Sequence, residues 1–466
     1  MKSIQISSGS WLALVLTAAG CWTAQAQDQR DEDIFGEKPA AEGKKPADGK
    51  SRTQNLVDTL QIGGRLEVRS STGQEEQQKL PDASFSQVKT ADVYFDTRPN
   101  RDMRVFLRQR FEELTPAVAN TTAAGTTPAV ACSSCVQSKI DELWFKWNID
   151  DAVFMTLGKQ HLKWGSSRFW NPTDFTARES RDPFALFDRR LGSDLLKIHI
   201  PQEKQGHNYY AIFQFDDMER NADLKFALRG EFSVASSAEL ALTAEAGSRQ
   251  PQRLGVDLSS ALGPFDGNIE AAATHRVQKQ FFEGTLDPST FQFPQAVEDE
   301  DRWFYQVSGG LRQTVKYSDD DNVSWGLEYF WNEFGYEERE LELYSLVLRQ
   351  SSPLYAGRRY AGLYVALQNP GSWNETSFYA NALGNLSDQT TVSRLTATWE
   401  VVDAATLEVY VSRCFGEFGE LCFKIPESYK ALANVPGIAE PLRQALTQLP
   451  TRRTVFTAGA GLSLVF

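Results

Sequence analysis

Residues 453–466, RTVFTAGAGLSLVF, decide the fold of this chain. The apolar positions alternate strictly and are Phe456, Ala458, Ala460, Leu462, Leu464 and Phe466. A period of two is what a β-strand needs when one face meets an apolar environment. The small and polar residues between them suit a wet interior. In a soluble protein this strand would be an exposed apolar edge strand, prone to aggregation, whereas a closed barrel in lipid has no edge strand.

The segment resembles the C-terminal strand of Gram-negative outer-membrane β-barrels, which end in Phe. The resemblance implies that Phe456, Leu462, Leu464 and Phe466 form the signal that the barrel-assembly machinery reads. It also implies an outer-membrane location, with outer-membrane lipid around the barrel.

The beginning of the chain agrees with export. Residues 1–26 read as a signal peptide, with Lys2, an apolar run and Ala24-Gln25-Ala26 before the cleavage point. Cys21, in Ala-Ala-Gly-Cys, offers the alternative of a lipidated N-terminus. Residues 27–56 are charged and rich in Pro, Gly and Ala, which predicts a disordered periplasmic tail. The barrel is then expected over residues 57–466.

Composition narrows the class of protein. The mean hydropathy of −0.40 is too polar for a helical membrane protein but suits strands that are half apolar. The net charge of −13, without a basic stripe, argues against nucleic acid as a partner.

Segments with period two follow one another to the end and predict about eighteen strands, an even number as bacterial single-chain barrels require. The connections support the count. One set is short: 99–102, 150–151, 201–206, 236–237, 263–267, 317–321, 369–373 and 402–404. The other set is long: 115–137, 161–192, 278–302, 332–357 and 414–452. An up-and-down barrel puts the short turns at the periplasmic end and the long loops outside. A soluble β-sandwich or propeller, the alternative, predicts no such asymmetry.

The cysteines form two local pairs, Cys132 with Cys135 and Cys414 with Cys422. We expect two disulfides that staple loops in an oxidising compartment. Zinc would require the two loops to meet, and a surface thiol–disulfide role is the remaining alternative. No cofactor and no metal are expected.

The segment LGKQHLKWG at 157–165, followed by FWNPTD at 169–174, resembles a stretch of several Gram-negative porin-like families. It leads into the long loop after the fifth strand. Because such a loop is too aromatic for easy disorder, we expect it to fold into the barrel mouth and constrict it. A compact outer cap is the alternative. Its basic residues are Lys163, Arg168, Arg178, Arg181, Arg189 and Arg190.

Five further arginines fall on polar strand faces and should line the lumen: Arg65, Arg69, Arg104, Arg108 and Arg110. Together with the loop they would make a positive track for anions, a layout similar to the lumen of the eighteen-stranded alginate-export porin. Acidic residues on the same faces could instead neutralise the track in ion pairs: Glu67, Asp92, Asp96, Glu142, Glu231, Glu328 and Glu408.

Three functions remain at this stage. The first is a porin-like channel for small hydrophilic, including anionic, solutes or for an exported polymer. The second is a structural barrel subunit of a cell-envelope or surface complex, with a periplasmic or surface partner. Two short helices expected in loop 414–452 would suit either. The third, an enzyme, is not expected, because the four histidines are scattered and no nucleophile motif or metal spacing accompanies them; His161 with Asp174 is the pair that would carry chemistry in the loop.

Overall fold

The computed structural model describes residues 59–114, 135–177, 181–185, 189–216, 218, 223–297, 301–318, 321–436, 438 and 440–466. The predicted signal peptide and tail, Cys132 and Arg178 lie outside these ranges. In the described ranges, no helix combines the length and apolar character that crossing a membrane would require.

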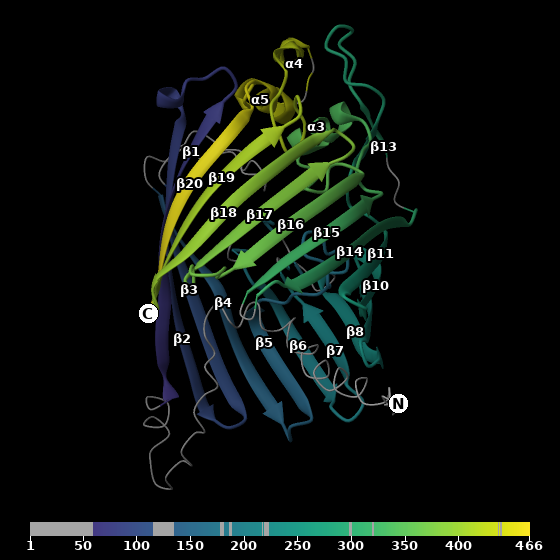
Figure 1. Cartoon of the computed structure of the whole chain (residues 1–466). Coiled ribbons are helices and arrows are strands. Elements are labelled where there is room, and N and C mark those ends of the chain that lie inside the picture. Colours follow the sequence, from purple (N-terminus) through teal and green to yellow (C-terminus); the bar gives the residue numbers. More distant parts are fainter. Residues whose placement is uncertain are drawn as a thin grey trace, which may run out of the picture. The chain divides into compact units, whose positions relative to one another are not determined.

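Eighteen antiparallel strands form one closed sheet, as the sequence predicts (Figure 1). In chain order they are β1 (Gln61–Glu75), β2 (Ser84–Asn100), β3 (Met103–Leu114), β4 (Cys135–Ile149), β5 (Val153–Gln160), β6 (Ser193–Gln202), β7 (His207–Gln214), β8 (Lys225–Ala235), β9 (Ala238–Gly247), β10 (Gln250–Leu262), β11 (Phe265–His275), β14 (Phe304–Lys316), β15 (Asn322–Asn332), β16 (Arg359–Gln368), β17 (Thr376–Asn385), β18 (Thr390–Val402), β19 (Ala405–Phe415) and β20 (Thr454–Val465).

The barrel closes where β20 pairs with β1. The last residue takes part in the closure, since the Phe466 amide donates to the Gly64 carbonyl at 3.0 Å and the Gly64 amide donates back at 2.9 Å. No strand edge is therefore left open along this seam.

Side chains alternate across the wall as period two requires. On β1, Leu66 and Val68 are each 44% exposed, whereas Arg65 and Glu67 between them are 3% and 4% exposed. On β20, Leu462 and Leu464 are exposed and Ser463 is buried. The wall thus presents apolar side chains outward and polar side chains to the lumen, which is the arrangement of a barrel in lipid.

The five long loops leave one end of the barrel, and the predicted short turns join the strands at the other end. Because strands alternate in direction, connections 76–83, 215–224, 248–249 and 386–389 share the end of the long loops. The last two are short, so loop length alone does not mark that end.

Three of the long loops fold together. Loop 276–303 carries the strand pair β12 (Phe281–Glu283) and β13 (Gln295–Val297). Loop 333–358 carries α3 (Arg339–Val347), and loop 416–453 carries α4 (Glu427–Lys430), η4 (Ala431–Asn434) and α5 (Glu440–Gln448). The helices in the third loop confirm the prediction. A further single turn, η2 (Leu80–Asp82), follows β1.

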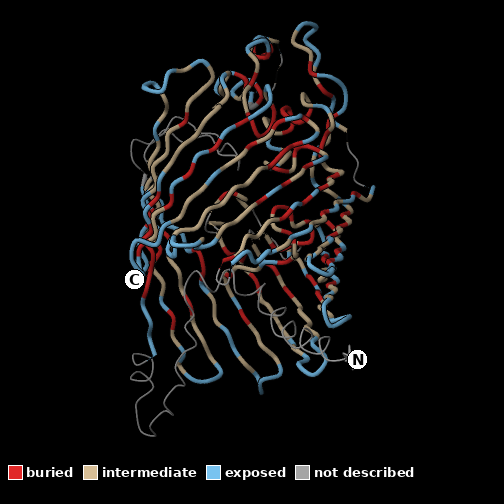
Figure 2. Tube along the Cα trace, in the orientation of Figure 1, coloured by how far each residue is buried: buried red, intermediate tan, exposed pale blue. Residues whose placement is uncertain are grey.

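We call these three loops the loop cap. They share a hydrophobic core to which each contributes, with Phe282, Tyr344 and Leu432 as examples. Figure 2 shows buried stretches among these loops, beyond the ends of the strands. Helix α3 was not predicted, because Leu341 and Leu343 alternate with glutamates and imitate a strand in sequence.

Candidate functional site

The loop between β5 and β6, residues 161–192, lies against lumen-facing side chains of strands far around the barrel. We call it the inner loop. Its described residues contact side chains of β10, β11, β14, β15 and β18, and its end returns to β1 and β3. The loop therefore folds inward, as expected, rather than into an outer cap.

Glu328 on β15 holds the first turn of the inner loop. Its carboxylate accepts the backbone N–H groups of Arg168 at 2.8 Å, Phe169 at 3.1 Å and Trp170 at 2.8 Å. Three successive amides around one anion form a nest, in which the backbone supplies the positive charge. Glu328, one of the acids expected to form ion pairs, thus accepts three main-chain amides of the inner loop.

Glu270 on β11 makes a second cradle. It accepts the Ser167 amide at 2.7 Å and the Thr173 hydroxyl at 2.7 Å, and its side chain is 0% exposed. Asp257 on the neighbouring β10 accepts the Ser166 hydroxyl at 2.6 Å. Hydrogen bonds to charged groups are the stronger ones, so these carboxylates anchor the loop to the wall.

Aromatic packing seals the same contact. Trp170 is fully buried, stacks on Phe330 at 5.7 Å and donates its indole N–H to the Leu354 carbonyl at 3.1 Å. Beside it, a Cβ at Gly362 would overlap the Phe169 ring. Glycine at this lumen position lets the loop approach the backbone of β16.

The returning part of the inner loop is held by charge. Arg189 pairs with Glu67 on β1 at 2.7 Å, and its carbonyl accepts from Arg110 at 2.7 Å. Arg190 pairs within the loop with Asp174 at 3.6 Å. Burial raises the pKa of the Asp174 carboxyl, and the positive charge of Arg190 partly offsets this rise.

The five strand arginines predicted to line the lumen do face inward, and each has a carboxylate partner. Their shortest ion pairs are Arg65–Asp92 at 3.1 Å, Arg69–Glu408 at 2.9 Å, Arg104–Asp96 at 2.8 Å, Arg108–Glu142 at 3.1 Å and Arg110–Asp141 at 2.8 Å. The lumen arginines and acids therefore form a network, as the alternative to a bare positive track expected.

The other predicted loop cations differ in setting. The Arg168 guanidinium lies 4.1 Å from the centre of the Tyr364 ring. Lys163 is exposed and Arg181 is half-buried.

Sequence reasoning missed Glu270 as an anchor. The signal for it was the alternation of β11, which turns Glu270 inward when Ile269 faces lipid.

Above the inner loop, the loop cap has its own buried acidic centre. Glu420 accepts the Leu354 amide at 2.6 Å and the Tyr360 hydroxyl at 2.6 Å. Burial raises the pKa of the Glu420 carboxyl to about 7. Asp388, which accepts the Glu420 amide at 2.6 Å, also has a pKa raised by burial.

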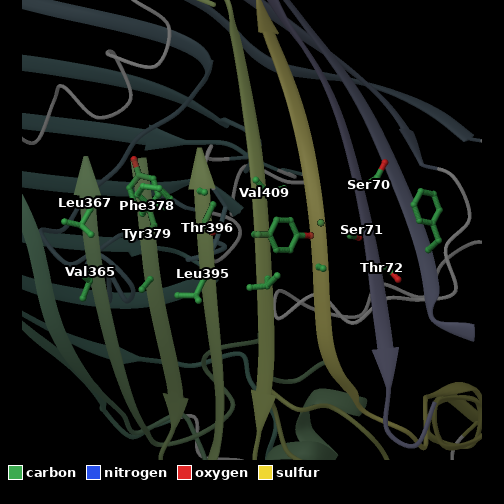
Figure 3. A pocket seen from close by; sticks show the side chains of 17 residues that line it. Ser70, Ser71, Thr72, Val365, Leu367, Phe378, Tyr379, Leu395, Thr396 and Val409 are labelled. Atoms are coloured by element: carbon green, nitrogen blue, oxygen red, sulfur yellow. The ribbon is translucent and has the colours of Figure 1, made fainter. Parts of the chain in front are cut away.

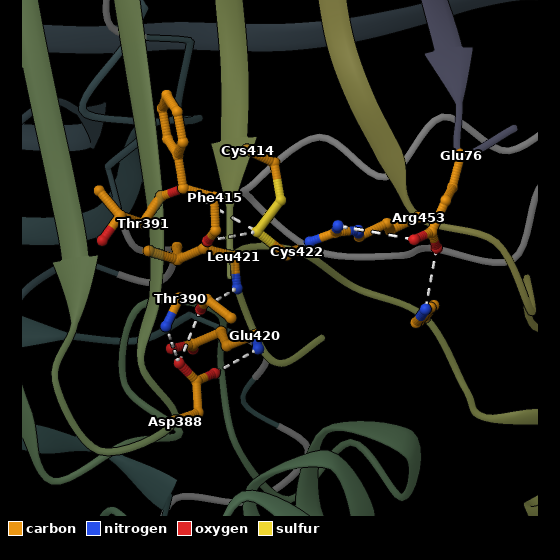
Figure 4. The surroundings of a disulfide bond; sticks show 11 residues. Glu76, Asp388, Thr390, Thr391, Cys414, Phe415, Glu420, Leu421, Cys422 and Arg453 are labelled. Atoms are coloured by element: carbon orange, nitrogen blue, oxygen red, sulfur yellow. Dashed lines mark hydrogen bonds and ion pairs between the residues drawn. A yellow bond between two sulfur atoms is a disulfide. The ribbon is translucent and has the colours of Figure 1, made fainter. Parts of the chain in front are cut away.

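A disulfide between Cys414 and Cys422 lies beside this centre (Figure 4). It ties the end of β19 to the start of loop 416–453, as predicted. The Cys132–Cys135 bridge remains a prediction, since Cys132 lies outside the described residues.

Two further features of the described residues bear on chemistry. The His161 ring lies 3.1 Å from the Asp141 carboxylate on β4. Within the described ranges, no group of three or more His, Cys, Asp or Glu residues is placed to hold a metal ion.

A hollow of about 720 Å³ lies in the wall beside the seam (Figure 3). Its lining includes Leu395 and Val409, which are exposed on the outward face of β18 and β19. This hollow therefore belongs to the lipid-facing surface and not to the lumen.

The sequence was compared with protein families and curated proteins, and the structure with solved structures. No family model and no curated protein matches the sequence. Among solved structures, OccK8 (OprE) of Pseudomonas aeruginosa is similar, with a TM-score of 0.50, 7% identity, and coverage of 88% of this chain and 99% of that one. OpdK of the same organism, in a structure with vanillate, has a TM-score of 0.49, 8% identity, and coverage of 88% and 99%.

A third similar structure is Wzi of Escherichia coli, an outer-membrane protein involved in group 1 capsule assembly and a carbohydrate-binding β-barrel. Its TM-score is 0.48, with 11% identity and coverage of 89% of this chain and 86% of that one. Identities this low show the fold alone. That fold, closed and apolar on its outer face, is the fold of a Gram-negative outer-membrane barrel.

Proposed function

We propose that this protein is an outer-membrane channel for small hydrophilic solutes, anions among them, or for an exported polymer, and not an enzyme. The inner loop is its constriction. The observation that carries the proposal is the pair of carboxylate cradles at Glu270 and Glu328, which hold a chain segment across the lumen.

An eighteen-stranded barrel encloses a lumen wide enough for water unless it is filled. A loop fixed by main-chain hydrogen bonds narrows such a lumen reproducibly, whereas a loose loop would not. The arginine network beside it offers polar contacts to a solute. Because its arginines are paired, its net field is weaker than that of bare cations.

The test is conductance of the purified protein in a planar bilayer under a salt gradient. We expect discrete openings and a reversal potential that is at most weakly anion-selective, because the lumen arginines are paired with carboxylates. A cation-selective reversal potential would remove the anion preference, and electrical silence would remove the channel.

A structural role in a surface complex is the second candidate, favoured by the loop cap. Three loops with a common hydrophobic core form an organised surface suited to a partner. A scaffold should co-purify with partners after crosslinking in intact cells and stay silent in the bilayer.

For assembly, we propose that Phe456, Leu462, Leu464 and Phe466 are the residues that the barrel-assembly machinery reads. Phe466 is 62% exposed while its backbone closes the seam, so its ring is accessible. Deleting Phe466 should lower the amount of folded barrel in the outer membrane, measured by heat-dependent gel migration.

A further inference from the structure

Six ring side chains line the lumen on six neighbouring strands. They are Tyr94 on β2, Phe106 on β3, Trp144 on β4, Phe154 on β5, His199 on β6 and Tyr210 on β7. Alternation turns them inward, because neighbouring residues along these strands, such as Phe95 beside Tyr94 and Leu143 beside Trp144, are exposed on the outer face. We call this set the lumen aromatic arc.

The rings of the arc lie in two runs of contacts. Phe106 is 7% exposed and stacks between Tyr94, at 5.8 Å, and Trp144, at 5.3 Å, so Tyr94 and Trp144 are the partly exposed rings of this run. In the second run, His199 lies 5.9 Å from Phe154 and stacks on Tyr210 at 4.5 Å. Neighbouring strands lie about 4.8 Å apart, so each run is roughly 10 Å long. Phe154 lies opposite Asn148, four residues from Trp144, so the second run is offset by roughly 13 Å along the strands toward the short turns.

Polar and charged groups alternate with the rings. The Arg104 guanidinium lies 5.4 Å from the Trp144 ring centre, and the Lys146 ammonium lies 5.6 Å from that of Phe154. Tyr210 donates to Glu231 at 3.2 Å, and His199 is hydrogen-bonded to Asn208 at 3.0 Å. Flat apolar faces beside fixed donors and acceptors are typical of small-molecule sites.

The arc lies between the inner loop and the short-turn end. The inner loop contacts these strands at Arg110, Asp141 and Gln214. Each of these residues is farther from the short turn of its strand than the arc residue of that strand. A solute passing the inner loop would therefore meet the arc next (Figure 1 shows β2 to β7 side by side).

We propose that the lumen aromatic arc is a binding track for oligosaccharides, which rests on the proposed channel function. A sugar ring presents an apolar C–H face that packs on an aromatic ring and a rim of hydroxyls that needs hydrogen-bond partners. The two runs of the arc together match a chain of several sugar rings better than a single small molecule. Its mixture of cations and carboxylates accommodates both neutral and acidic sugars.

The test measures binding by titration calorimetry on the purified full chain, with maltohexaose and hexagalacturonate as the neutral and acidic probes. Trp144→Ala should weaken binding about tenfold, through lost ring contact. The matched control is Trp147→Ala, three residues along β4 on the lipid face, which should change affinity less than about twofold. Phe154→Leu, which keeps an apolar side chain but removes the ring, tests the site if Trp144→Ala does not assemble.

The outcomes separate the two proposals. Binding of either probe that falls with Trp144→Ala or Phe154→Leu and not with Trp147→Ala supports the track. No binding of either probe at millimolar concentration, or equal losses in the lumen and lipid-face variants, overturns it. Conductance of the same preparations is measured independently. If the protein shows no conductance but binds sugar in this way, the channel function is contradicted and the binding track is supported. If the protein conducts but binds neither probe, the binding track is contradicted and the channel function is not.

Discussion

The inner loop and the loop cap are both built from long loops at one end of the barrel, yet they are held by different forces. The inner loop contacts the wall through buried carboxylates that accept its amides and hydroxyls. The loop cap is held by a hydrophobic core shared among three loops. A polar anchor is directional and fixes one position of a segment, while an apolar core stabilises a compact body. The first suits a constriction, the second a lid or a docking surface.

The largest effect is expected for Glu328→Ala. Two buried amides and one part-buried amide lose their acceptor, so opening of the inner loop should become easier by about 3 kcal/mol. Conductance should rise and become noisier, and hydrogen exchange of the amides at 168–170 should accelerate. Asp266→Ala, which removes an exposed partner of Arg312, is the control and should change neither. Unchanged exchange in Glu328→Ala would mean that the cradle does not hold the loop.

Removing the disulfide tests what holds the loop cap, the second of the two regions compared. Replacing both Cys414 and Cys422 by Ala should destabilise the start of loop 416–453 by about 2–3 kcal/mol, because the closed loop in the unfolded state is lost. Proteolysis within the loop cap should become faster, with exchange at 168–170 unaffected. Equal loosening of the inner loop would show that the two regions are one cooperative unit.

The stability of the loop cap should also depend on pH. The Glu420 carboxyl has a pKa of about 7 in the folded cap, above its usual value, because it is buried. The folded state therefore binds more protons, so this contribution is full below about pH 4.3 and is lost as the pH rises to about 7. We expect the cap to lose on the order of 2 kcal/mol between pH 5 and pH 7, read as faster proteolysis.

Glu420→Gln should flatten this pH dependence, since amide and protonated carboxyl are similar in shape. Burial lowers the pKa of Lys279 to about 7, so this group stabilises the folded cap as the pH rises above 7. It therefore contributes little to the change in stability between pH 5 and pH 7. A slope that persists in full in Glu420→Gln would assign the effect to Glu342 and Asp388, because burial raises the pKa of both carboxyls as well.

The smallest effect is expected on the surface of the loop cap. Arg443 pairs with Glu440 at 3.3 Å across one turn of α5, and both side chains are exposed. Arg443→Ala should cost about 0.3 kcal/mol and vanish in high salt. A cost above about 1 kcal/mol, measured by thermal unfolding, would show that the cap depends on its surface charges as well as its core.

Much of the wall was predictable because period two is a local signal. Each strand was recognisable from alternation, and the inward position of Arg65 or Arg108 followed from it. The anchors of the inner loop were not predictable, since Glu270 and Ser167 are 103 residues apart and Glu328 and Arg168 are 160 apart. Nothing local in a glutamate tells whether it will accept an arginine or a row of amides.

By itself, the sequence determined that this chain forms a closed barrel of about eighteen strands and which strand faces are apolar on the outside. Those properties follow from the alternation of side chains along each strand and from a final strand that has no stable place outside a closed sheet. Only the tertiary structure decided that the inner loop is held by Glu270 and Glu328, that the lumen arginines are paired, and that six inward rings lie in two runs of contacts on neighbouring strands. Those contacts depend on closure of the barrel, which brings distant strands to face the same lumen.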